Sequence, residues 1–144
     1  MIEILDKNVL IIGDPTSGKT FYSKQLAAYN KSHKLIHTDD YLRFGKENSL
    51  YVLLNNLKRI KQPTIIEGVL GYRLLRKGAE EKSYYPDIVI EIVISEELKN
   101  NRILERNIDK SKIEAQIKGN KKVLEDYKSI MNEYNPPIWI TVNN

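Results

Sequence analysis

The chain has 144 residues, of which 41% are hydrophobic and 29% are charged, and its formal net charge is +4. This length is enough for a buried core, so we expect residues 1–144 to form a single domain. The absence of cysteine excludes disulfides and thiol chemistry. The two histidines, His33 and His37, are too few for a histidine-rich metal site and are expected to be structural.

Charge and hydropathy also limit the partners and the location of the protein. The lysines are spread along the chain, so the mildly basic charge permits nucleic-acid binding without requiring it. No apolar run approaches the roughly 18 residues of a membrane-spanning helix, and residues 1–7 lack the basic start of a signal peptide. We therefore expect a cytoplasmic protein with no membrane partner, and the sequence is compatible with a homo-oligomer.

The first strand and the segment after it carry the most specific motif of the chain. Residues 9–12 are apolar and mostly β-branched, as in a buried parallel strand. Residues 13–20 read Gly-Asp-Pro-Thr-Ser-Gly-Lys-Thr, which matches the Walker A pattern G-x-x-x-x-G-K-[ST] of a phosphate-binding loop, or P-loop. Residues 20–30 are predicted to form a helix. Strand, loop and helix are the context that this motif requires.

The P-loop indicates ATP as the ligand and Mg²⁺ as the metal. Gly13 and Gly18 let the backbone turn tightly and approach the phosphates, and successive backbone N–H groups at a helix N-terminus bind anions. Lys19 is expected to reach the β- and γ-phosphates, and the hydroxyl of Thr20 is expected to ligate Mg²⁺. The nucleotide is expected to contact Gly13, Asp14, Pro15, Thr16, Ser17, Gly18, Lys19, Thr20 and Phe21.

Carboxylates follow the next two predicted strands. The second strand, 34–38, leads into residues 37–41 (HTDDY), and the third strand, 64–67, ends at Glu67. Ligands of parallel sheets bind at the carboxyl ends of the strands, which is also the edge of the P-loop. Asp39 is the candidate base for an acceptor hydroxyl, and Glu67 is the candidate for the Mg²⁺ shell or the acceptor. A helix N-cap and a solvated loop carboxylate are the structural alternatives for these two residues.

The rest of the chain continues the alternation of helices and strands. Helices are expected over 49–61, 72–81, after an N-cap at Ser95, and over 112–134 with a weak interruption at 119–120; strands are expected over 88–94 and 138–142. This order predicts an α/β, three-layer P-loop NTPase fold, with a five-stranded, mostly parallel sheet and helices on both faces. Arg102 and Arg106 are four residues apart, so they share a helix face and could stabilise a transferring phosphoryl group. Pairing with Glu97 or Glu105 is the alternative.

The P-loop, residues 38–41 (TDDY) and residues 65–70 (IIEGVL) resemble the P-loop small-molecule kinases, most closely the uridine kinase and phosphoribulokinase group. Chloramphenicol phosphotransferases, zeta-type toxins and the kinase domain of polynucleotide kinases show a similar aspartate. The resemblance spans nearly the whole chain and implies an aspartate base, a glutamate facing the substrate and a lid of arginines that closes over the phosphates. Residues 101–107 (NRILERN) occupy the lid position, so a lid is expected around residues 95–120.

Together these features predict a phosphotransferase that moves the γ-phosphate of Mg-ATP to a hydroxyl or phosphate of a small acceptor, with a nucleoside or nucleotide favoured. The expected roles are catalysis by Lys19, Asp39 and Arg102; a further nucleotide contact from Arg106; metal binding by Thr20 and Glu67; and acceptor binding by Asp39, Tyr41, Arg43, Glu67, Tyr72 and Arg73.

Two other classes of function stay open. One is a P-loop ATPase or nucleotide-dependent switch that acts on a nucleic acid or protein. It is disfavoured because no aspartate precedes Glu67 in the third strand. The other is a P-loop binding module that has lost turnover.

Overall fold

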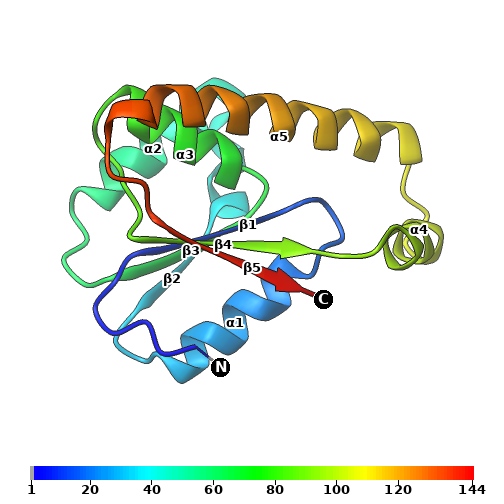
Figure 1. Cartoon of the computed structure of the whole chain (residues 1–144), viewed down its shortest axis with the longest axis horizontal. Helices are drawn as coiled ribbons and strands as arrows, with labels where there is room; N and C mark the ends of the chain where they lie inside the picture. Colours follow the sequence, from blue (N-terminus) through cyan, green and yellow to red (C-terminus); the bar gives the residue numbers. More distant parts are fainter. Residues whose placement is uncertain (1) are drawn as a thin grey trace.

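The structure is a computed structural model that describes residues 2–144, apart from the side chain of residue 46. Its centre is a sheet of five parallel strands in the order β2-β3-β1-β4-β5 (Figure 1). The strands are β1 Val9–Gly13, β2 Lys34–His37, β3 Thr64–Glu67, β4 Ile88–Val93 and β5 Ile138–Asn143. The predicted α/β architecture is confirmed, and every strand pair in it is parallel.

Helices cover both faces of this sheet. The α-helices are α1 Lys19–Tyr29, α2 Lys46–Leu57, α3 Gly71–Glu80, α4 Glu96–Glu105 and α5 Lys110–Ile130, and two 3₁₀ helices are η1 Thr38–Phe44 and η2 Met131–Glu133. In Figure 1, α1 lies on one face of the sheet, α2, α3 and α5 lie on the other, and α4 stands beyond the tip of β4. No helix of the described chain is both long enough and apolar enough to cross a membrane.

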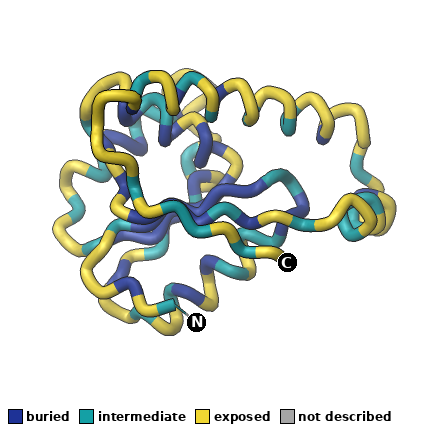
Figure 2. The backbone as a smooth tube through the Cα atoms, in the orientation of Figure 1, coloured by how far each residue is buried: buried dark blue, intermediate teal, exposed yellow. Residues whose placement is uncertain are grey.

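The central strands are buried on both faces, which explains their unbroken apolar sequences. Alternate side chains of a strand point to opposite faces. In β1, Leu10 and Ile12 belong to the core under α2, α3 and α5, whereas Val9 and Ile11 belong to the core over α1. Figure 2 shows this burial concentrated in the sheet, while the outer turns of the helices are exposed.

Several element boundaries differ from the predicted ones. The helix expected over 49–61 is α2 Lys46–Leu57, and the preceding 3₁₀ helix η1 was not expected. The weak interruption predicted at 119–120 is wrong, because α5 continues through Gly119. Ser95 caps α4 as predicted, since its hydroxyl accepts a hydrogen bond from the N–H of Leu98 at 3.1 Å.

Candidate nucleotide and phosphotransfer site

The P-loop leaves β1 and wraps around the start of α1. Gly18 has φ +92° and stands at the N-cap of α1 with no side chain to occupy the first helical N–H groups. A Cβ on Gly13 would lie 3.0 Å from the carbonyl oxygen of Ile92, so the loop passes close to β4. The hydroxyls of Thr16 and Ser17 are buried without hydrogen-bond partners among the described residues. Free helical N–H groups and orphaned hydroxyls are the donors that phosphate oxygens require, so the loop fits a nucleotide.

Side chains from distant segments contact the P-loop backbone. The guanidinium of Arg102 in α4 donates a hydrogen bond to the carbonyl oxygen of Thr16. The side-chain amide of Asn144, which follows β5, donates to the carbonyl oxygen of Ser17 at 3.0 Å. Because these contacts use loop carbonyls, they occupy none of the loop N–H groups, of which the Ser17 N–H already donates to the Asp14 carbonyl oxygen at 3.0 Å.

A pocket of about 380 Å³ opens beside the start of α1. Its lining contains P-loop residues, positive charges from α1 and α4, and one aromatic ring: Thr16, Gly18, Lys19, Thr20, Phe21, Lys24 and Arg106. Arg106 is the C-cap residue directly after α4, so Arg102 and Arg106 both approach the loop from this part of the chain. The Phe21 ring is 69% exposed, which leaves it available to a bound molecule.

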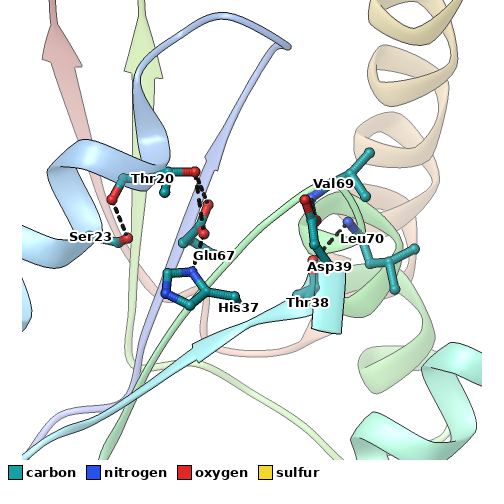
Figure 3. Close-up of polar contacts among 8 residues, drawn as sticks. All are labelled: Thr20, Ser23, His37, Thr38, Asp39, Glu67, Val69 and Leu70. Atoms are coloured by element: carbon teal, nitrogen blue, oxygen red, sulfur yellow. Dashed lines mark hydrogen bonds and ion pairs between the residues drawn. The ribbon is translucent and has the colours of Figure 1, made fainter. Parts of the chain in front are cut away.

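Three polar side chains form a chain across the carboxyl ends of β2 and β3 (Figure 3). The hydroxyl of Thr20 donates to Glu67, with its oxygen 3.3 Å from Oε2 and 3.5 Å from Oε1. On the other side of the carboxylate, Nδ1 of His37 lies 2.5 Å from Oε1 of Glu67. Glu67 is only 3% exposed, so this buried carboxylate is held by its two neighbours.

The Thr20–Glu67 pair has the chemistry of a magnesium site. A hydroxyl and a carboxylate are oxygen donors, which are the ligands that Mg²⁺ prefers. No group of three or more His, Cys, Asp or Glu residues that could hold a metal occurs in the described part of the chain. A sparse protein donor set suits Mg²⁺ in nucleotide sites, because the remaining ligands are substrate phosphates and water. Thr20 and Glu67 therefore fit the expected metal.

Asp39 lies beside this chain of contacts, at the start of η1. Its Oδ1 accepts a hydrogen bond from the N–H of Val69 at 3.1 Å, and the hydroxyl of Thr38 accepts one from the N–H of Leu70 at 3.1 Å (Figure 3). Both contacts fix the turn that leads from β3 into α3. The N-cap alternative is wrong for Asp39, because it caps neither η1 nor α3 and instead holds the turn before α3 through Oδ1. Its Oδ2 accepts no hydrogen bond from the residues that the structure describes.

Lys19 is a cation within electrostatic range of these carboxylates. Burial lowers the pKa of Lys19, and the negative charges of Glu67, Asp39 and Asp14 oppose that shift. Burial also raises the pKa of Asp14, which Lys99 of α4 counteracts. Lys19, Asp39 and Glu67 are therefore close enough to influence one another electrostatically, as expected from the position of each at the same edge of the sheet.

Solved structures share the fold of this chain. The chain superposes on shikimate kinase from Acinetobacter baumannii with a TM-score of 0.55 and 18% identity, over 96% of this chain and 83% of that one. A candidate kinase from Chloroflexus aurantiacus gives 0.55 and 18%, over 96% and 89%. A protein from Thermus thermophilus gives 0.55 and 14%, over 96% and 88%. The chain has the fold of the P-loop kinases. At these identities the likeness shows the fold alone, and the closer resemblance to the uridine kinase group is not confirmed.

No protein-family model matches the chain, and no curated protein is similar to it in sequence. The function of this P-loop kinase fold must therefore be argued from its own site.

The residues expected to bind the acceptor are not gathered into one pocket. Tyr41 and Arg43 line a hollow along the edge strand β2, where the guanidinium of Arg43 lies 4.9 Å from the centroid of the Phe44 ring. Arg73 lines a separate hollow between α2 and α3. Tyr72 is 7% exposed, and burial raises the pKa of its phenol. The acceptor roles of these residues stay predictions.

Sequence reasoning missed two residues that contact the site. His37 was expected to be an ordinary structural residue, yet it contacts Glu67. The sequence contained a signal for this contact, because His37 and Glu67 each end a predicted strand. The two strands, β2 and β3, are parallel neighbours, and His37 lies opposite Glu67. Asn144 carries no such signal, since its contact with Ser17 depends on where β5 lies in the sheet.

Proposed function

We propose that this protein is an ATP-dependent phosphotransferase that moves the γ-phosphate of ATP to a hydroxyl or phosphate of a small acceptor. The observation that carries the proposal is the hydrogen bond between Thr20 of the P-loop and Glu67 of β3, with Asp39 beside it at the same sheet edge. This edge joins a phosphate cradle, an oxygen-donor pair for a metal, and a carboxylate with a free oxygen. A phosphoryl transfer site needs these three parts.

The residues divide the chemistry among themselves. The loop N–H groups and Lys19 would bind the β- and γ-phosphates, and Thr20 with Glu67 would hold the metal. When bound, Mg²⁺ neutralises phosphate charge. Asp39 accepts the proton of an acceptor hydroxyl. The oxygen of that hydroxyl bonds to the γ-phosphorus, while the bond between the γ-phosphorus and the β–γ bridging oxygen breaks to release ADP.

We infer that α4 and the start of α5 act as a lid. Arg102 and Arg106 reach the P-loop from α4. Movement of Arg102 from the Thr16 carbonyl oxygen to a γ-phosphate oxygen would place positive charge where negative charge develops during transfer. The lid also excludes water from the reaction, which favours transfer over hydrolysis.

The acceptor is proposed to be a nucleoside or a nucleotide. The test is a transfer assay with γ-labelled ATP and Mg²⁺ against nucleosides, nucleotides, sugars, sugar nucleotides and 5′-hydroxyl oligonucleotides, with acceptor-free hydrolysis as the baseline. Label moving to one acceptor class supports the proposal and names the substrate. Hydrolysis without labelled acceptor, raised by DNA, RNA or a protein, would favour the ATPase class instead.

A further inference from the structure

We propose that His37 is a positioning residue for the metal site, an inference that rests on the proposed phosphotransferase function. Its imidazole holds the Glu67 carboxylate in the orientation that pairs it with the hydroxyl of Thr20. His37 itself does not contact nucleotide or metal in this role.

The contacts of Glu67 carry the argument. The described residues give this carboxylate two hydrogen-bond partners, Thr20 on one side and His37 on the other. The carboxylate is almost fully buried, so water cannot replace a lost partner freely. The Thr20 contacts, at 3.3 and 3.5 Å, are long, whereas His37 contacts the carboxylate from the residue directly paired with Glu67 on the neighbouring strand. His37 is therefore the partner that fixes where the carboxylate points.

The chemistry of the contact sets the direction of the hydrogen bond. An ionised carboxylate can only accept, so Nδ1 of His37 carries the hydrogen and donates it to Oε1 of Glu67. The carboxylate then accepts from the Thr20 hydroxyl as well, which leaves the lone pairs of that hydroxyl for a metal. One imidazole N–H thus orients both proposed metal-binding side chains.

The scaffold makes this orientation rigid. His37 and Glu67 are directly paired across the parallel strands β2 and β3, and β3 is buried along its whole length. Groups held on neighbouring strands are positioned more tightly than groups on loops. Residues that orient metal ligands typically change metal affinity by about 10–100-fold when they are replaced.

The experiment compares three variants that differ in what they present to Glu67. His37→Leu removes the N–H donor but keeps a side chain of similar size, and His37→Asn supplies an amide N–H near the position of Nδ1. Lys34→Ala is the control, because it changes an exposed residue of the same strand. Binding of a fluorescent ATP analogue is titrated with and without Mg²⁺, and Mn²⁺ binding to the nucleotide complex is followed by electron paramagnetic resonance.

We expect His37→Leu to weaken metal binding in the nucleotide complex by about 10-fold or more. We expect His37→Asn and Lys34→Ala to stay close to the parent protein, and nucleotide affinity in EDTA to be the same in all four. If His37→Leu kept the metal affinity of the parent protein, the inference about His37 would be wrong and the phosphotransferase proposal would stand. The same holds if His37→Asn lost as much metal affinity as His37→Leu. A parent protein that binds no nucleotide would overturn the phosphotransferase proposal and this inference with it.

Discussion

Lys19 is a cation that the fold partly buries in the absence of phosphate. Its lowered pKa means that the unfolded chain binds this proton more tightly than the folded protein does, so the free energy of unfolding rises with pH in the range where Lys19 titrates. We expect Lys19→Met to stabilise the nucleotide-free protein at neutral pH by about 1 kcal/mol. The gain should shrink as the pH approaches the ordinary lysine pKa. Urea unfolding at a series of pH values measures it.

The same variant separates stability from function. Lys19→Met should lose nucleotide affinity by about 10–100-fold, because a hydrogen bond to a charged phosphate contributes about 1.5–3 kcal/mol. Lys31→Met is the matched control, since Lys31 is an exposed lysine just after the same helix and does not line this pocket. If Lys19→Met bound nucleotide as tightly as the parent protein, the P-loop would not be the phosphate-binding site.

Asp39→Asn tests the base with little change in structure. The asparagine keeps a side-chain oxygen for the N–H of Val69, so the turn into α3 should survive. It cannot accept a proton, and we expect the transfer rate to fall by about 10²–10⁴-fold while ATP binding is retained. Single-turnover kinetics with labelled ATP measures the transfer step. Transfer at the parent rate would show that another group accepts the proton.

The sequence predicts part of this site because part of it is local. Thr20 belongs to a motif whose strand, loop and helix are consecutive, and Glu67 is the last residue of a recognisable strand. His37 could not be assigned from its own surroundings in the chain, because its contact with Glu67 depends on the register between two strands about 30 residues apart. Arg43 follows β2 and Arg73 follows β3, the two strands that carry the carboxylates, but the two arginines line different hollows.

Two glycines inside helices provide a matched test of packing at the scale of the element. A Cβ on Gly78 of α3 would lie 2.7 Å from Cβ of Tyr84 and 2.8 Å from its carbonyl oxygen, whereas a Cβ on Gly119 of α5 meets nothing within 4 Å. We expect Gly78→Ala to destabilise the protein by about 1–3 kcal/mol through overpacking. Gly119→Ala should stabilise it by about 0.5–1 kcal/mol, as alanine replaces glycine in an open helix interior. Denaturant unfolding measures both, and equal effects would contradict the packing argument.

The same glycines show which features of the elements a sequence can reveal. Residues 118–122 contain a glycine and an asparagine, which are weak helix formers, so an interruption is expected from propensity alone. Buried residues lie on both sides of Gly119 in α5, Ile113 before it and Val123 and Tyr127 after it, and this burial holds the helix through the glycine. Strand positions were predictable because five apolar runs alternate with helices. The 3₁₀ helix η1 was not, since it depends on the turn after β2.

At the scale of the whole molecule, the P-loop is where distant segments meet. Glu67 reaches it from β3, Arg102 from α4 and Asn144 from the end of β5. A ligand in the loop would therefore act on elements spread along the sequence. The opposite edge of the sheet contains a hollow of about 440 Å³, which is lined by the end of α2, the start of β3 and the loops before β1, β3 and β4.

This asymmetry predicts where nucleotide binding should rigidify the molecule. We expect Mg-ATP to slow hydrogen exchange in residues 13–20 and 96–106, because the loop binds phosphates and α4 closes on them through Arg102 and Arg106. Exchange in residues 57–64, at the opposite edge, should change only through global stabilisation, which amounts to about 2.7 kcal/mol at a ligand concentration of 100 Kd. Mass spectrometry of the exchanged peptides measures each segment, with Lys19→Met at the same ATP concentration as the comparison that should show weaker local protection, in proportion to its lower occupancy. Protection centred on residues 57–64 instead would place the nucleotide at the wrong edge of the sheet for this mechanism. If Mg-ATP slowed exchange in residues 13–20 but not in residues 96–106, the nucleotide site would be supported and the lid proposal would be wrong.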